Sequence, residues 1–175
     1  MNNWKQFFRN SLFIKYSSSN LKTTFDQQKI IIYNHKKDNL FISTSTNIKF
    51  EELEELCNAV GWVKRPLQKV KLALKNSLLI ITLYRENNRN THLIGFVRVI
   101  SDQAFNAIIW DMVIHPDYQK QGLGKLLMKI TIQELRYIEI DTITLFADSQ
   151  SISFYNRLGF ITDPYNIKGM FWYPK

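Results

Sequence analysis

The stretch from residue 107 to residue 129 constrains the fold more than any other part of this chain. It reads A-I-I-W-D-M-V-I-H-P-D-Y-Q-K-Q-G-L-G-K-L-L-M-K. The isoleucine- and valine-rich run from Ala107 to Ile114 predicts a buried strand, which ends before Pro116 because proline lacks the N–H that a sheet ladder needs. Apolar residues then recur with the spacing of one helix face, at Leu123, Leu126, Leu127, Ile130 and Leu135. The stretch therefore predicts a buried strand that leads through a glycine-bearing turn into an amphipathic helix.

The turn between this strand and this helix predicts an anion site. Gly122 and Gly124 leave backbone N–H groups uncovered by side chains, and the helix dipole adds partial positive charge there. Phosphate suits such a site best. The spacing matches neither a P-loop nor the dinucleotide fingerprint, so those two classes of nucleotide site are excluded. An ordinary strand–helix turn, with glycines placed for packing, is the alternative interpretation.

Two motifs carry a family resemblance. The pattern Q-x-x-G-x-G at residues 119–124 resembles the acetyl-CoA motif of the GNAT family of N-acetyltransferases, [R/Q]-x-x-G-x-[G/A]. The segment S-I-S-F-Y-N-R-L-G-F at residues 151–160 resembles the family's A-x-x-F-Y-x-x-[LM]-G-F. From about residue 61 onward the chain is most similar to the plastid and cyanobacterial group that includes the plant serotonin N-acetyltransferase. Members of that group are linked to acetylation of serotonin and of protein lysines and N-termini.

Composition bounds the class of protein. With 175 residues and 45% hydrophobic content, the chain suits one domain with its own core. A formal charge of +8 favours an anionic ligand, but no nucleic-acid-binding signature accompanies it. Cys57 is the single cysteine, so an intrachain disulfide is excluded, and the three histidines lack metal-ligand spacing. We therefore predict no metal, no nucleic-acid partner and no membrane span.

The N-terminal segment indicates the domain organisation, and the amino-acid composition indicates the cellular location. Residues 1–38 are predicted to be a partly ordered N-terminal extension, with a cleavable transit peptide over residues 1–28 as the alternative. Residues 39–175 are predicted to be the acetyltransferase domain, a monomer or a homodimer. The abundance of Asn, Ile and Lys is typical of A/T-rich genomes. It favours a plastid protein of the chloroplast stroma, is compatible with encoding by the plastid genome, and leaves the cytoplasm as the location if the source is bacterial.

The predicted order of elements matches the GNAT fold from about residue 40 to the end. The expected elements are an extra edge strand at 29–33, a strand at 40–43, helices at 47–60 and 66–75, strands at 78–84, 92–100 and 107–114, a helix from 123, a strand at 140–147, a helix at 149–158, and strands at 160–162 and 168–173. This resemblance implies an α+β fold in α/β/α layers. Its mixed, mostly antiparallel central sheet is splayed at the acetyl-CoA site.

The resemblance also implies where acetyl-CoA binds. A bulge is expected near Asp111-Met112-Val113, where pantetheine pairs with the strand and an N–H near Met112 faces the thioester oxygen. The pyrophosphate is expected on the amides of Gln121 to Lys125. Asp148 and Ser151 stand where many relatives have asparagine and alanine, which leaves their contacts open. The predicted binding residues for this co-substrate are Met112, Val113, Ile114, Gln119, Lys120, Gln121, Gly122, Leu123, Gly124, Lys125, Asp148, Ser151 and Tyr155.

Two side chains are predicted to be catalytic. Tyr155 is the general acid, since a phenol with a pKa near ~10 stays protonated at neutral pH and can protonate the departing thiolate. Asp111 is the first choice for the base, because an acid in an apolar strand demands an explanation. His115 is the second choice, and a structural role is the alternative for both.

The acceptor is the least constrained part of the prediction. Residues predicted to line an aromatic acceptor groove are Trp62, Arg65, Phe105, Trp110, Phe171, Trp172 and Tyr173, and we expect half or more of them to lie in the core. The predicted reaction is transfer of acetyl directly to a primary amine, either an arylalkylamine such as serotonin or tryptamine or a protein lysine or N-terminus. A GNAT-fold acetyl-CoA sensor without turnover is the alternative; Tyr155 argues against it, because a pure binder needs no acid.

Overall fold

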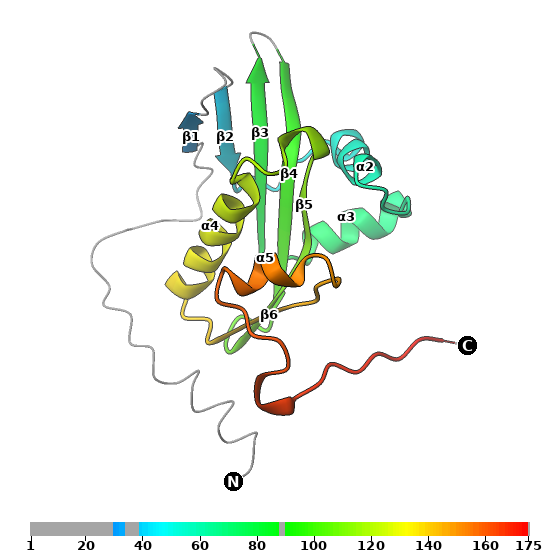
Figure 1. The fold of residues 1–175 in the computed structure, drawn as a ribbon. Coiled ribbons are helices and arrows are strands. Elements are labelled where there is room, and N and C mark those ends of the chain that lie inside the picture. Colours follow the sequence, from blue (N-terminus) through cyan, green and yellow to red (C-terminus); the bar gives the residue numbers. More distant parts are fainter. Residues whose placement is uncertain (1–29, 34–38, 88–89, 175) are drawn as a thin grey trace. The chain divides into compact units, whose positions relative to one another are not determined.

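The computed structural model describes residues 30–33, 39–87 and 90–174 (Figure 1). The chain divides into two compact units, and the described residues up to Phe146 belong to the larger one. The residues from Ala147 onward belong to the smaller one. Each unit is described by itself.

A six-stranded sheet forms the centre of the larger unit. Its strands are β1 (Ile30–Tyr33), β2 (Asn39–Ser43), β3 (Leu79–Asn87), β4 (Asn90–Ser101), β5 (Asn106–Ile114) and β6 (Thr142–Leu145). They lie side by side in sequence order. Neighbouring strands are antiparallel up to β5, and β5 and β6 are parallel. The predicted mixed, mostly antiparallel sheet and the extra edge strand at residues 30–33 are thus confirmed.

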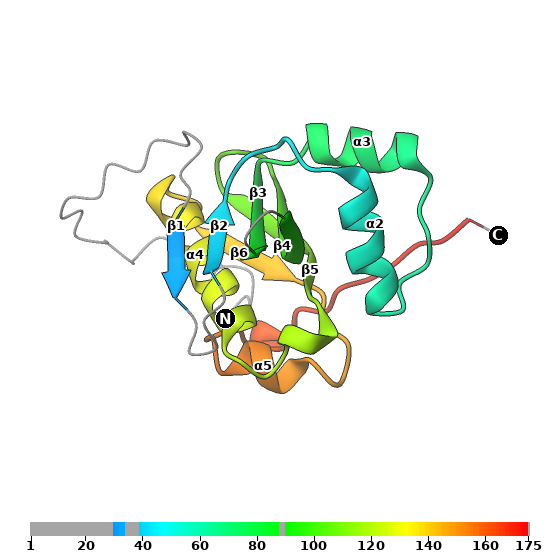
Figure 2. The same ribbon diagram turned by 90° about the horizontal axis from the view of Figure 1, so that it is seen from above.

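Helices cover both faces of this sheet, as the prediction of α/β/α layers required (Figure 2). Helices α2 (Phe50–Ala59) and α3 (Leu67–Lys75) lie on one face, and α4 (Leu123–Tyr137) lies on the other. The buried residues of α4 are Leu123, Leu127, Met128, Thr131 and Leu135, which is the face that the sequence spacing predicted. None of the helices in the described ranges is long and apolar enough to cross a membrane.

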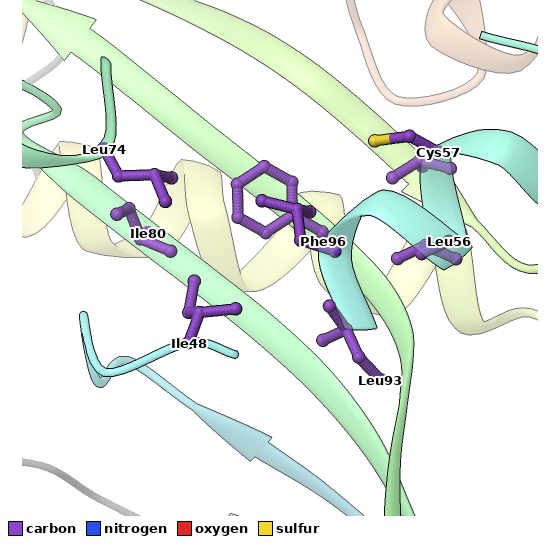
Figure 3. Packing of buried hydrophobic residues seen from close by; sticks show 9 residues of the cluster. Ile48, Leu56, Cys57, Leu74, Ile80, Leu93 and Phe96 are labelled. Atoms are coloured by element: carbon purple, nitrogen blue, oxygen red, sulfur yellow. The ribbon is translucent and has the colours of Figure 1, made fainter. Parts of the chain in front are cut away.

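The core between the sheet and α2 is centred on Phe96 of β4, which has no exposed surface. Figure 3 shows its ring between Ile80 of β3 and Leu56 of α2. Val113 of β5 belongs to the same cluster, so the strand that leads into the glycine turn is fixed by this core. Burial of a side chain of this size contributes about 1.5–3 kcal/mol to folding.

The smaller unit differs from the prediction. Its helix α5 (Ile152–Asn156) forms where a helix was expected, but the predicted strands at 160–162 and 168–173 are wrong, since residues 147–174 contain no strand. Asp163 and Tyr165 have positive φ values of 46° and 56° on either side of Pro164, and the short 3-10 turn η2 (Pro164–Asn166) replaces extended backbone. Apolar residues favour a strand only where a neighbouring strand supplies hydrogen bonds, and here that ladder is not formed.

The predicted domain boundary at residue 39 stays a prediction. Strand β1 falls within the predicted extension, and it pairs with β2 over its whole length. The predictions for residues 1–29, including the transit peptide, lie outside the described residues.

Candidate functional site

A bulge interrupts β5 at the position that the sequence predicted. Phe96 of β4 pairs with Val113 and Arg98 pairs with Trp110, so one residue of β4 stands opposite both Asp111 and Met112. Asp111 has a φ of 52°, in the left-handed region. A two-against-one bulge of this kind turns backbone groups out of the ladder. The main chain at Asp111 and Met112 is therefore available to a ligand.

The neighbouring strand leaves β5 just before this bulge. The register of β5 and β6 runs from Asn106 and Thr142 to Ile109 and Leu145, where β6 ends. Beyond Ile109, β5 continues through the bulge to Ile114 without a partner in β6. This is the predicted splay of the sheet. The main chain on the β6-facing side of the bulge is left without a partner strand. An extended ligand can form hydrogen bonds there in the way that an added strand does.

The turn at the carboxyl end of β5 presents main-chain N–H groups. Gly122 is the N-cap of α4 with a φ of 82°, makes no side-chain cap bond, and is exposed. The first turn of α4 contains no acidic residue. Its leading amides have no acceptor within the helix, since the first bond of α4 is donated by Leu126 N–H to Gly122 C=O at 3.0 Å. With the helix dipole, this arrangement fits the phosphates of a nucleotide-bearing ligand.

Three side chains hold this turn in place. The Gln119 amide donates from Nε2 to the carbonyl of Ile114 at 2.9 Å, and the Gln121 amide donates to the carbonyl of Asp117 at 2.9 Å. His115 accepts the Asp117 N–H on Nδ1 at 3.3 Å. The glutamines of the motif therefore shape the turn through these bonds. His115, the second choice for the base, has only Nε2 left for proton transfer.

The other predicted residues around the turn divide by exposure. Val113, Ile114 and Leu123 have buried side chains, so they can meet a ligand only through main-chain groups. Lys120 and Lys125 are exposed, and Lys120 has a φ of 58°. Met112 and Gly124 are half-buried.

Asp111 does not point to open solvent but into a cluster of cations. Its carboxylate accepts from Nε of Arg98 on β4 at 2.5 Å and from Nη1 of Arg65 at 3.0 Å to each oxygen. Arg65 belongs to the connector from Val60 to Pro66, between the end of α2 at Ala59 and the start of α3 at Leu67. The Asp111 and Arg98 side chains are 14% exposed, and the Arg65 side chain is 38% exposed. Sequence reasoning did not find this cluster. The one sequence signal for Arg98 was its place on a strand expected to pair with the strand that carries Asp111. No sequence signal linked Arg65 to Asp111.

Tyr155 lies in the smaller unit, where its own motif holds it. Its ring makes edge contacts with Phe154 at a centroid distance of 5.0 Å and with Phe160 at 6.0 Å, so the two phenylalanines of F-Y-N-R-L-G-F support the phenol. Burial, and then the negative charge of Asp148, raise the pKa of Tyr155 above its usual value. Asp148 also accepts the N–H of Ser151 on Oδ1 at 2.8 Å, at the start of α5. Tyr155 is thus kept protonated at neutral pH.

The predicted aromatic residues are less buried than expected. Exposed fractions are 36% for Trp62, 63% for Phe105, 36% for Trp110, 60% for Phe171, 84% for Trp172 and 75% for Tyr173, so the expectation that half or more lie in the core is wrong. Two of them have defined partners in the larger unit. Trp62 lies against the Arg65 guanidinium at 6.0 Å, and Trp110 packs against Phe146 with ring centroids 5.5 Å apart. Trp62 and Trp110 stay partly exposed because of their location: Trp62 lies on the connector between α2 and α3, and Trp110 lies on β5 beyond the end of its pairing with β6.

Comparison with known sequences agrees with this geometry. Residues 79–162 match a family model described as "Acetyltransferase (GNAT) domain". The protein named "Uncharacterized N-acetyltransferase ycf52" of Porphyra purpurea is 53% identical over 172 residues, which cover 98% of each chain. The Arabidopsis thaliana protein named "GCN5-related N-acetyltransferase 2, chloroplastic" is 44% identical over 154 residues, covering 79% of this chain and 60% of that one.

Comparison with solved structures supports the same fold. The "Acetyltransferase, GNAT family protein SP0256" of Streptococcus pneumoniae TIGR4 superimposes with a TM-score of 0.66 at 27% identity, covering 78% of this chain and 98% of the other. A ribosomal-protein-S18-alanine N-acetyltransferase of Escherichia coli gives a TM-score of 0.57 at 20% identity, covering 69% and 76%; this second likeness shows the fold alone.

Proposed function

We propose that this chain, which belongs to the GNAT family of acetyltransferases, transfers the acetyl group of acetyl-CoA directly to a primary amine. Its relatives confirm the resemblance to the plastid and cyanobacterial group and a plastid location. The observation that carries the proposal is the combination found along β5. A bulge at Asp111–Met112 follows the end of β5–β6 pairing and precedes an uncapped helix N-terminus. A thioester carried on a long phosphorylated arm needs all three.

The residues around β5 fit the parts of acetyl-CoA. The amides from Gln121 to Lys125 would hold the pyrophosphate, with Lys120 and Lys125 adding charge from exposed positions. The main chain from Met112 to Ile114, which has no partner in β6, would pair with pantetheine on that side. In the smaller unit, Asp148 and Ser151 are proposed to contact the pantetheine or adenosine portion.

The chemistry requires one bond to form and one to break at the thioester carbon. A neutral amine attacks that carbon, the new C–N bond forms, and the N–H near Met112 stabilises the developing oxyanion. The C–S bond then breaks, and Tyr155 gives its proton to the thiolate of CoA. The nitrogen, now bonded to the acetyl carbon, gives up one proton to the base or to water, and the phenol regains its proton from solvent. The raised pKa of Tyr155 favours this role, because the phenol is in its acid form at the working pH.

The acceptor amine must lose a proton before it attacks. A primary alkylamine has a pKa near ~10.4, so it arrives protonated at neutral pH. Asp111 remains a predicted base, with His115 through Nε2 as the second choice and bulk water as a further one. Whichever group accepts the proton, the rate is expected to rise with pH until that group or the amine has titrated.

The proposed acceptor is an arylalkylamine, with peptide lysine or N-terminal amines also accepted. Support comes from the Trp110–Phe146 pair and from Trp62, which offer exposed aromatic surface on β5, at the end of β6 and on the connector. The two cations around Asp111 disfavour a polyamine, because they outnumber the one acid between them.

A panel of acetyl transfers tests this function. The purified chain is given radiolabelled acetyl-CoA with serotonin, tryptamine, spermidine or a lysine-containing peptide at matched concentrations. We expect tryptamine and serotonin to be acetylated faster than spermidine, with measurable transfer to the peptide. Spermidine turning over fastest would contradict the proposed acceptor. Tight acetyl-CoA binding without transfer to any amine would instead support the non-catalytic sensor.

A further inference from the structure

We infer that Asp111 is a positioning residue, through which Arg65 and Arg98 lock the connector from Val60 to Pro66 onto the β5 bulge and so set the affinity for the acceptor. This inference rests on the proposed function, because it concerns the same strand. It assigns Asp111 a role other than that of the base. It also assigns a role to two arginines and to the connector that carries one of them.

The geometry of the carboxylate carries the first step. Both oxygens of Asp111 accept from Arg65 Nη1 at 3.0 Å, and Oδ2 also accepts from Arg98 Nε at 2.5 Å. All three side chains are held within the larger unit, two of them 14% exposed. A base needs an electron pair that can take a proton. Protonation of this carboxylate would leave two guanidinium groups facing each other without their counter-ion.

The backbone carries the second step. Asp111 adopts a φ of 52° at the two-against-one bulge, a conformation that non-glycine residues hold only when their surroundings fix it. The two guanidinium contacts supply that fixation, since one comes from the adjacent strand β4 and the other from outside the sheet. The amide of Met112 follows directly. A carboxylate anchored in this way determines where that amide points.

The connector carries the third step. Arg65 contacts three partners at once: Asp111, the Cys57 thiol at 3.6 Å from Nη2, and the Trp62 ring at 6.0 Å. Burial lowers the pKa of Arg65, but the charge and hydrogen bonds of Asp111 outweigh it and raise that pKa, so the guanidinium stays charged. The connector has no helix or strand between α2 and α3, and Val63 within it is 86% exposed. Its attachment to the sheet therefore depends on Arg65.

Trp62 and Trp110 each neighbour one arginine of this ion cluster. Trp110 is the register partner of Arg98, and Trp62 lies against Arg65. An aromatic acceptor held by either ring is positioned by the same carboxylate. Loss of the cluster is thus expected to weaken acceptor binding more than acetyl-CoA binding, which depends on the main chain of the turn.

Steady-state kinetics of Arg65→Met, Asp111→Asn and the double variant test the inference. Each single change should raise the acceptor KM about tenfold, a size typical of coupled neighbours, while the acetyl-CoA Kd changes less than about twofold. The double variant should be no worse than Asp111→Asn alone, because both changes remove one interaction. The rise of rate with pH should keep its shape in Asp111→Asn. Lys64→Met, in the same connector but paired at the surface with Glu54, is the matched control and should leave the KM unchanged.

Proteolysis gives a readout that does not depend on turnover. Cleavage after Lys64 by a lysine-specific protease should be faster in Arg65→Met and Asp111→Asn than in the wild type, since the connector is released. Unchanged cleavage, or additive kinetic effects, would overturn the inference. A loss of the pH-dependent rise in Asp111→Asn, with Arg65→Met fully active, would establish Asp111 as the base instead. Wild-type protein that transfers acetyl to no amine would defeat the proposed function, and the cleavage test would still decide whether the cluster holds the connector.

Discussion

The turn that precedes α4 and the connector between α2 and α3 both lie next to β5, but the turn acts through main-chain atoms and the connector through side chains. The turn from Gln119 to Gly124 offers main-chain N–H groups, and the glutamine side chains there shape the loop. The connector acts through side chains, above all Arg65 on Asp111. A main-chain site depends on backbone conformation and tolerates many side chains. A side-chain site depends on specific pairs that can be far apart in sequence, 46 residues in this case.

The largest effect on acetyl-CoA affinity is expected from a change in the turn that offers main-chain N–H groups. Gly122→Glu forces a side chain into a φ of 82° and places negative charge at the phosphate site. We expect acetyl-CoA affinity to fall about 10²-fold or more by calorimetry, since like charges placed together cost several kcal/mol. Gly61→Glu is the control, because Gly61 has a φ of 78° and equally open surroundings but lies at the end of α2. Unchanged affinity in Gly122→Glu would remove the turn from the cofactor site.

The second largest effect is expected from Tyr155→Phe. It tests whether the chemical step depends on a side chain, whereas acetyl-CoA binding depends on the main chain. Tyr155→Phe should lower turnover about 10²-fold while the acetyl-CoA Kd stays within about threefold, because the phenol acts only as the leaving group departs. Rapid-mixing experiments under chemistry-limited conditions measure this. Tyr137→Phe, at an exposed position of α4, should be silent. Near wild-type turnover in Tyr155→Phe would require another acid.

A smaller effect is expected in the pH profile. Burial and then the charge of Asp148 raise the pKa of Tyr155, so Asp148→Asn removes one of the causes and lowers that pKa. The acid form of Tyr155 is then lost at a lower pH. The alkaline fall of kcat should therefore begin at lower pH in Asp148→Asn than in the wild type, and Asp141→Asn should leave the profile unmoved. A shift to higher pH would contradict this account of the charge.

The smallest effects are expected from side chains of the turn itself. Lys120 already has a φ of 58°, so Lys120→Gly relieves strain and should change the free energy of unfolding by less than about 1 kcal/mol. Acetyl-CoA affinity should fall no more than about threefold, since one solvated charge is lost. Chemical denaturation and calorimetry measure the two quantities. A loss as large as that of Gly122→Glu would show that the lysine side chain, and not the main chain, holds the phosphates.

The same contrast explains what the sequence could predict. The strand, turn and helix from Ala107 to Tyr137 were predictable because their signals are local: an apolar run, a proline, glycines and a 3.6-residue period. The bulge came from the family resemblance, and the register of β4 and β5 confirms it. The pairing of Arg65 with Asp111 was not predictable, because it is a tertiary contact between residues 46 apart in the sequence. The apolar strand around Asp111 marked the acid as unusual but did not identify its partner. The strands expected after Leu158 failed for the converse reason, since a local apolar pattern lacked the partner strand that a ladder requires.

The single cysteine has a practical and a physiological consequence. Cys57 is buried in the α2 core, and burial, the largest influence on it, raises the pKa of its thiol. A protonated, enclosed thiol is a poor nucleophile and exchanges slowly with disulfides. Colorimetric thiol reagents will therefore report the CoA released in each turnover with little background from the protein. For the same reason, turnover is expected to be insensitive to the thiol redox state of the protein's surroundings.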